Sequence, residues 1–114
     1  MAASQGDIFF LDFGPRNDAR IEGPHYLVVV QANALNELPN YPLTIVTPIS
    51  STGRRSGTHV KLEPESKNGL AHTSFVKCEQ ILTIAAYRLT DKRGALSLTD
   101  LYRVKEALRI TLGL

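Results

Sequence analysis

Two short stretches of the sequence carry side chains that could act together on one substrate. The stretch 23–26, Gly-Pro-His-Tyr, brings a histidine to the start of an apolar run, and the stretch 50–52, Ser-Ser-Thr, follows a second apolar run. Histidine exchanges protons near neutral pH because its ordinary pKa is about 6.5, and a serine hydroxyl can donate a hydrogen bond to a phosphate oxygen. If the two apolar runs pair as strands, His25 and Ser50 lie together at one rim of the sheet.

Both residues also have purely structural interpretations. A histidine that follows a Gly-Pro turn can hydrogen-bond its own turn, and a serine at the end of a strand commonly forms a turn or a cap. From the residues alone, these alternatives stay open for His25 and for Ser50.

A basic turn lies close behind the second stretch. Arg54 and Arg55 stand between Gly53 and Gly57, in a composition typical of an exposed hairpin-like turn. Paired arginines can grip RNA phosphates in a sequence-independent, salt-sensitive way, or they can simply form a solvated loop.

The totals place the chain among small globular proteins. Its 114 residues suit one domain, and a hydrophobic fraction of 43% permits a real core. The single cysteine excludes an intramolecular disulfide and a multi-cysteine metal site, which fits a reduced, cytoplasmic setting. No apolar run approaches the ~20 residues of a membrane span, and the first residues lack the features of a signal peptide. The net charge of +2 does not by itself indicate a nucleic-acid binder.

Hydrophobic patterning predicts several short strands and one helix. The predicted strands are 6–13, 25–31, 43–47, 58–62 and a longer region, 73–84; a helical turn could lie within 32–42. Ser97 is suited to cap a helix with Asp100 three residues later, and Gly113 marks its end. One helical face is expected to hold Leu98, Leu101, Val104, Leu108 and Leu112. The expected fold is mainly β, a small curved barrel closed by a C-terminal helix.

Five segments in this order and spacing resemble the MazF/PemK family, the small toxins of toxin–antitoxin modules. They are 6–12, 27–31, 48–51, 58–60 and 78–84, followed by the C-terminal stretch 106–114. The resemblance implies one SH3-like barrel domain over 6–114, behind a flexible N-terminus of residues 1–5. It also implies a homodimer that cleaves single-stranded RNA without a metal or other cofactor, with an antitoxin protein as a partner and no role for a membrane.

The sequence departs from the family pattern at three places. The arginine that usually enters the second strand, the catalytic position, is His25. A second common arginine is Leu82, and the usual Glu-Gln pair is Arg20-Ile21. The family's hydroxyl after the third strand is present as Ser50.

RNA cleavage without a metal can use the 2′-hydroxyl as an internal nucleophile, so three tasks remain for the protein. It must remove the 2′-proton, stabilise charge on the phosphorane and protonate the leaving 5′-oxygen. His25 can serve as the general acid or base, and Ser50 can support the phosphate.

The resemblance and the basic loops together suggest a set of RNA-binding residues. They are Arg20, Tyr26, Arg54, Arg55, His59, Ser74, Glu79 and Gln80. Tyr26 could stack on a base, Glu79 could partner a basic group, and His59 could equally be a satisfied surface histidine. Alternation along the expected strand sends the neighbours Glu79 and Gln80 to opposite faces, so at most one of them points directly into a given site. His72 has no such support, and the phenylalanines are expected in the core.

A rival hypothesis keeps the barrel without the catalysis. The chain would then be a degenerate toxin that still holds an antitoxin, or a poison of a protein target like the CcdB toxins, which share the barrel. A fold alone does not decide between these functions.

Overall fold

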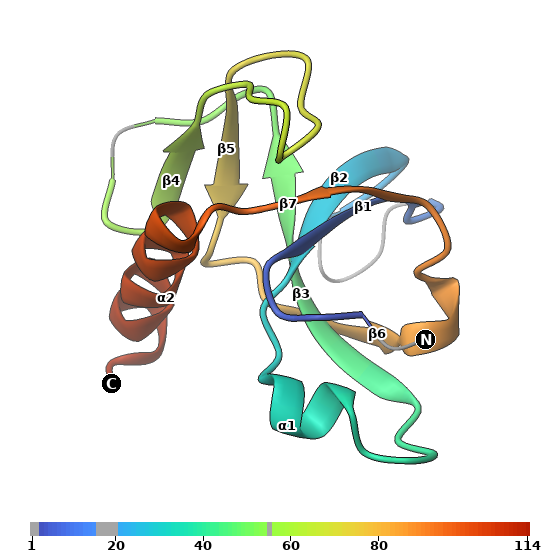
Figure 1. Ribbon diagram of the computed structural model, residues 1–114. Helices are drawn as coiled ribbons and strands as arrows, with labels where there is room; N and C mark the ends of the chain where they lie inside the picture. Colours follow the sequence, from blue (N-terminus) through green and yellow to red (C-terminus); the bar gives the residue numbers. More distant parts are fainter. Residues whose placement is uncertain (1–2, 16–20, 55) are drawn as a thin grey trace.

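The strand β3 (Leu43–Ser50) is the centre of the computed structural model, which describes residues 3–15, 21–54 and 56–114 (Figure 1). The remaining elements are β1 (Asp7–Asp12), β2 (Pro24–Val29), α1 (Asn33–Asn36), β4 (His59–Leu62), β5 (Ser74–Lys77), β6 (Leu82–Ala85), a 3-10 helix (Ala86–Arg88), β7 (Lys92–Ala95) and α2 (Leu98–Leu112). The predicted fold class, mainly β with a C-terminal helix in one domain, is therefore confirmed.

All strand pairs in the sheet are antiparallel, in the order β4-β5-β3-β2-β1-β7. β3 serves two partners along one edge, because its end pairs with β5 at Ile49 and Ser50 while its first half, Leu43 to Val46, pairs with β6. This division bends the sheet and curls it towards a barrel, with α2 lying beside β4 (Figure 1).

Two apolar clusters fill the two sides of the curled sheet. One cluster contains Ile8, Val28 and Val76 together with Val104 and Ala107 from α2. The buried residues of the other cluster are Phe9, Leu27, Val29, Val46 and Ile84. Strands buried on both faces need apolar residues at successive positions, which explains the unbroken apolar run in β2.

The helix α2 has the predicted ends but a narrower apolar face. The Ser97 Oγ accepts a hydrogen bond from the backbone N–H of Asp100 at 3.1 Å, and Gly113 ends the helix in the left-handed region at φ 70°. Leu98 and Leu112, at the two ends of the predicted face, are 82% and 56% exposed, so this face is buried only in part. The buried residues of α2 are Val104 and Ala107, and the Thr111 Oγ1 in its last turn is buried as well.

The region 73–84 is two strands rather than one. A turn at Cys78 and Glu79 separates β5 from β6, and the Gln80 N–H donates to the Lys77 carbonyl at 3.0 Å. The alternation argument for Glu79 and Gln80 is therefore wrong, because these residues lie in the turn and not on a strand.

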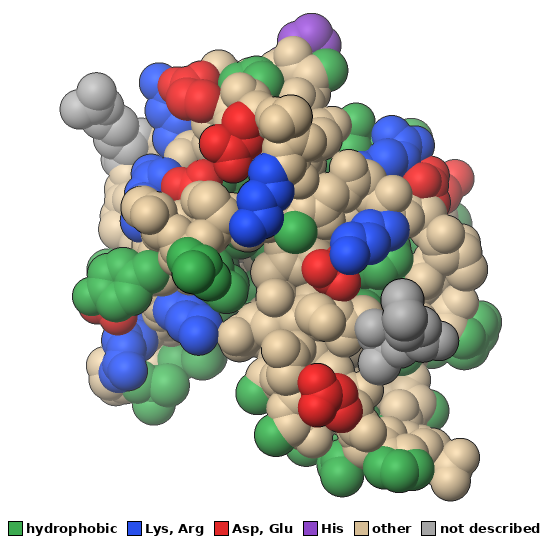
Figure 2. Space-filling view, in the orientation of Figure 1, with side chains coloured by type: hydrophobic (Ala, Val, Ile, Leu, Met, Phe, Trp, Pro, Cys, Tyr) green, Lys and Arg blue, Asp and Glu red, His purple; other side chains and the backbone are tan. Residues whose placement is uncertain are grey.

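Charges on the face shown in Figure 2 are mixed, with Lys and Arg side chains standing among Asp and Glu rather than forming one basic field. Within the described ranges, no helix has the length and apolarity needed to cross a bilayer.

Candidate active site

An open pocket of about 400 Å³ lies at the rim where β2 begins and β3 ends. Tyr26 of β2 pairs with Ile49 of β3, so His25 and Ser50, one position further along each strand, lie next to each other at this rim. Ser50 also pairs with Phe75, which places the start of β5 on the other side of Ser50. Four of the predicted site residues line the pocket: His25, Tyr26, Ser50 and Ser74. Phe10 and His72 are among the lining residues that the sequence did not assign to a site.

The His25 ring is held by its own turn. Its Nε2 lies 3.0 Å from the Glu22 carbonyl oxygen, and its ring packs edge-on against Phe13 at 6.2 Å between centroids. A carbonyl oxygen only accepts hydrogen bonds, so Nε2 carries the hydrogen and donates it. In the neutral ring Nδ1 is then the basic nitrogen. The bond to the turn fixes the ring and leaves Nδ1 available to take a proton.

Ser50 belongs to a small hydroxyl turn. Its Oγ accepts a hydrogen bond from the Thr52 N–H at 3.2 Å and lies 3.1 Å from the Thr52 Oγ1. Within the described part of the chain no hydrogen bond joins Ser50 to His25; the two residues meet by lining the same pocket. The hydroxyl can turn towards a bound phosphate because a serine oxygen both donates and accepts.

Ser74, unlike Ser50, is buried and uses its hydroxyl in a hydrogen bond to the backbone. It is 7% exposed, and its Oγ donates to the His72 carbonyl oxygen at 2.9 Å. This bond ties the segment before β5 to the strand, so Ser74 helps to shape the pocket wall at Ala71 and His72.

A permanent positive charge stands behind one wall of the pocket. The guanidinium carbon of Arg93 lies 4.7 Å from the centroid of the Phe10 ring and 5.7 Å from that of Tyr26, within the range of a cation–π contact. Asp91 holds the guanidinium through two hydrogen bonds of 2.8 and 2.9 Å, which raise the pKa of Arg93 and lower that of Asp91. The sequence offered no signal for Arg93, because β7 lacks the apolar alternation of a strand.

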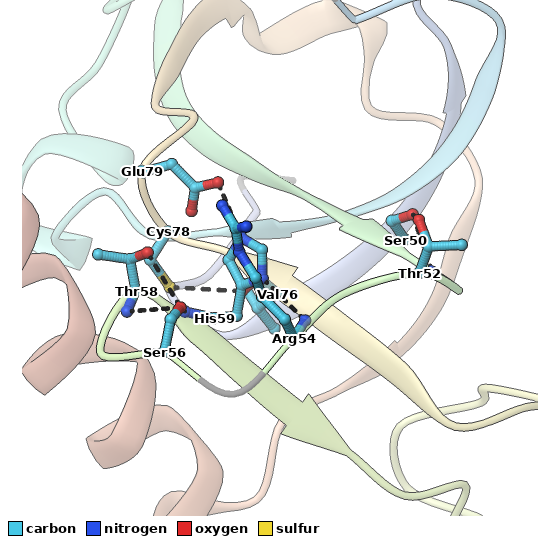
Figure 3. Close-up of polar contacts among 9 residues, drawn as sticks. All are labelled: Ser50, Thr52, Arg54, Ser56, Thr58, His59, Val76, Cys78 and Glu79. Carbon is cyan, nitrogen blue, oxygen red and sulfur yellow. Dashed lines mark hydrogen bonds and ion pairs between the residues drawn. The ribbon is translucent and has the colours of Figure 1, made fainter.

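A second polar group, shown in Figure 3, lies over β4 and the turn after β5. The His59 Nε2 donates to the Glu79 carboxylate at 2.9 Å, and its Nδ1 accepts from the Arg54 N–H at 3.3 Å. Both ring nitrogens are thus occupied, and the side chain is 8% exposed. Glu79 does pair with a basic residue, and His59 has the partners of a satisfied histidine.

The Glu79 carboxyl is shifted towards its charged form. Partial burial acts to raise its pKa, but the hydrogen bond from His59, its own backbone N–H and the Thr58 side chain together lower the pKa below the ordinary value. None of His59, Glu79 or Arg54 is among the residues that line the pocket. Gln80 is half-buried in the turn. Arg20 and Arg55 lie outside the described residues.

Comparison with known proteins gives one consistent result. The family model described as "PemK-like, MazF-like toxin of type II toxin-antitoxin system" matches residues 4–112. Endoribonuclease EndoA of Bacillus subtilis is 32% identical over 116 residues, which cover 100% of this chain and 97% of that protein. Endoribonuclease MazF of Staphylococcus saprophyticus is 33% identical over 114 residues, covering 96% of this chain and 91% of that protein.

Solved structures share the fold. A mycobacterial endoribonuclease in complex with its cognate antitoxin superposes with a TM-score of 0.81 at 23% identity, covering 99% of this chain and 97% of that one. MazF of Deinococcus radiodurans gives a TM-score of 0.79 at 18% identity, covering 100% and 99%. These likenesses confirm the predicted MazF-like barrel. The chain belongs to the family of PemK-like, MazF-like toxins of type II toxin–antitoxin systems.

Proposed function

We propose that this chain is a toxin endoribonuclease that cleaves single-stranded RNA in the cytoplasm by attack of the 2′-hydroxyl, without a metal ion or other cofactor. The observation that carries the proposal is the His25 ring, whose Nε2–H is spent on the Glu22 carbonyl oxygen while the ring lines a pocket beside the Ser50 hydroxyl. The names of the endoribonuclease relatives support the same reaction class.

In this reaction His25 acts as the general base. Nδ1 takes the proton of the 2′-hydroxyl as the 2′-oxygen attacks the adjacent phosphorus. The Ser50 hydroxyl donates to a phosphate oxygen, on which negative charge grows in the transition state. Cleavage leaves a 2′,3′-cyclic phosphate on one product and a 5′-hydroxyl on the other.

Residues around the pocket would hold the RNA. Tyr26 offers a ring for stacking, and Arg54 on the exposed loop would contact phosphates. Arg20 and Arg55, which lie outside the described residues, are further proposed phosphate contacts. Gln80 remains a candidate for a base contact. His59 and Glu79 would position the loop that carries Arg54, because the His59 ring accepts a hydrogen bond from the Arg54 N–H and donates one to Glu79.

Two further features of the proposal concern partners. We expect the chain to form a homodimer and to bind a cognate antitoxin, in line with the mycobacterial endoribonuclease–antitoxin complex and the MazE-MazF structures of Deinococcus radiodurans. Light scattering after size-exclusion chromatography measures the oligomeric state directly.

The test of the proposed activity uses purified protein, labelled single-stranded RNA and excess EDTA. We expect cleavage that leaves 5′-hydroxyl ends, and no cleavage of an RNA with a single 2′-deoxy substitution at the cut site. His25→Ala should lose activity, whereas Arg109→Ala, which removes an exposed arginine paired with Glu106 on α2, should keep it. Wild-type protein that leaves every RNA intact would instead favour a non-catalytic module that binds an antitoxin or another protein.

A further inference from the structure

Base catalysis by His25 leaves one task without a residue, the protonation of the 5′-oxygen as it leaves phosphorus. An alkoxide is a poor leaving group in water, so a positioned acid contributes typically about 10²- to 10⁴-fold to such a step. We propose that His72 is this general acid, and that His25 and His72 form an acid–base pair across the pocket. The inference rests on the proposed ribonuclease function.

The pocket contains few groups that can exchange a proton. Among its described lining residues the titratable side chains are His25, His72 and Tyr26, and no carboxylate lines it. Tyrosine has an ordinary pKa of about 10, so its proton leaves too reluctantly near neutral pH. Arg93, a cation beside the Phe10 and Tyr26 rings, gives up protons poorly. A second imidazole is the side chain that suits the acid's task.

The two histidines differ in the hydrogen bonds that their rings make within the described residues. The Nε2–H of His25 is donated to the Glu22 carbonyl oxygen, which leaves Nδ1 to accept. The His72 ring makes no hydrogen bond to the described residues, and the residue is exposed to solvent. What is fixed is its backbone, because the buried Ser74 hydroxyl donates to the His72 carbonyl oxygen at 2.9 Å. A protonated His72 therefore has a free N–H to deliver at the pocket.

The sheet order places the groups as in-line displacement requires. The attacking and leaving oxygens lie on opposite sides of the phosphorus. In the order β5-β3-β2 the central strand carries Ser50, β2 carries His25 on one side, and His72 lies two residues before the start of β5 on the other. A phosphate held at Ser50 would then have the base on the side of the 2′-oxygen and the acid on the side of the 5′-oxygen.

The step balances in protons and bonds. The 2′-oxygen forms a bond to phosphorus as its proton passes to the His25 Nδ1. The bond from phosphorus to the 5′-oxygen breaks, and that oxygen takes a proton from the His72 imidazolium. The cyclic phosphate and the 5′-hydroxyl are released with His25 protonated and His72 neutral, and exchange with water restores both.

The experiment compares two RNA substrates that differ only in the leaving atom. In the second substrate a bridging sulfur replaces the 5′-oxygen, and a thiolate leaves without needing a proton. We expect His72→Ala to slow cleavage of ordinary RNA by about 100-fold or more and cleavage of the sulfur substrate by less than about threefold. His25→Ala should be slow on both. His72→Gln, a polar variant of similar size, should behave as His72→Ala does.

Two readouts separate an acid from a structural residue. His72→Ala should bind an uncleavable 2′-deoxy RNA as the wild-type protein does, and its loss of rate should be confined to the substrate with the 5′-oxygen leaving group. Equal slowing of both substrates, or ordinary RNA cut at the wild-type rate by both His72 variants, would overturn the inference and leave the ribonuclease standing. A wild-type protein inactive on both substrates would overturn the proposed function and this inference with it.

Discussion

Replacing Gly53 by alanine should destabilise the protein, although the same exchange usually has the opposite effect. Gly53 precedes the Arg54–His59 contact in Figure 3 and packs directly on Phe75 of β5. A Cβ at residue 53 would lie 2.3 Å from the Phe75 Cγ and 2.6 Å from its Cβ. Since Cβ atoms in ordinary contact are at least 3.4 Å from such neighbours, the loop must lift by about 1 Å.

The magnitude follows from two opposing terms. Gly53 is not among the glycines with positive φ, so alanine fits the backbone and stabilises by ~0.4–1 kcal/mol through the unfolded state. Overpacking against a side chain that is anchored to a strand costs about 1–3 kcal/mol. Mid-range values of the two terms, about 2 and about 0.7 kcal/mol, give a net loss of about 1.3 kcal/mol, which lowers the melting temperature by about 5 °C for a domain of this size. The same shift lengthens the Arg54-to-His59 hydrogen bond, which is already 3.3 Å.

Thermal unfolding monitored by circular dichroism measures this loss, and the chain offers a matched control. A Cβ at Gly57, in the same loop, would lie 3.1 Å from the flexible end of Ile110, so Gly57→Ala should change the melting temperature much less. In a Phe75→Ala background the cost of Gly53→Ala should shrink, because two of the three close ring and side-chain atoms are gone. An unchanged or raised melting temperature for Gly53→Ala would refute the contact.

Two other perturbations test the charges near the proposed RNA site. Arg93→Gln should weaken binding of uncleavable single-stranded RNA and reduce the slope of log K against log salt by about 0.7, the contribution of one phosphate contact. Arg93→Lys, which keeps the charge, should retain the slope. A slope for Arg93→Gln identical to that of the wild-type protein would show that Arg93 does not contact the RNA. Because the folded state lowers the pKa of Glu79, its ionised form stabilises fully above about pH 4.5 and loses this effect as the pH falls through the lowered pKa. Glu79→Gln should therefore cost up to about 1 kcal/mol at pH 7, since the carboxylate is 38% exposed, and less near pH 3; urea denaturation at both pH values decides, and a cost that grows towards pH 3 contradicts the assignment.

The barrel and the His25–Ser50 rim were predictable because their signals are local. An apolar run after a Gly-Pro turn and a hydroxyl cluster after a second apolar run mark strand ends, and antiparallel pairing of neighbours brings those ends together. The ends of α2 were equally readable from Ser97 and Gly113, whose capping needs no tertiary contact.

What the sequence could not show depends on partners distant along the chain. β7 has no apolar alternation, and its Gly94 is required by a close approach to Asn68, where a Cβ would lie 2.5 Å from backbone. Arg93 contacts the rings of Phe10 on β1 and Tyr26 on β2, and His72 lines a pocket with residues of β2 and β3. No spacing in the sequence therefore relates either residue to His25. The turn at Cys78 and Glu79 contains no Gly, Pro, Asn or Asp to mark it, so the sequence shows no break between β5 and β6.

The three-way pairing of β3 makes the proposed catalytic groups unequal in their freedom to move. Freeing Ser50 requires the end of β3 to separate from β5, and freeing the neighbouring His25 disturbs the pairing of β2 with both β1 and β3. Backbone amides in such a strand exchange with deuterium only when the whole sheet opens, whereas segments with fewer ties open locally. His72 enters from such a segment, ahead of the first residue of β5. The proposed base and hydroxyl are therefore held by paired strands, whereas the backbone at His72 is held by the Ser74 side chain.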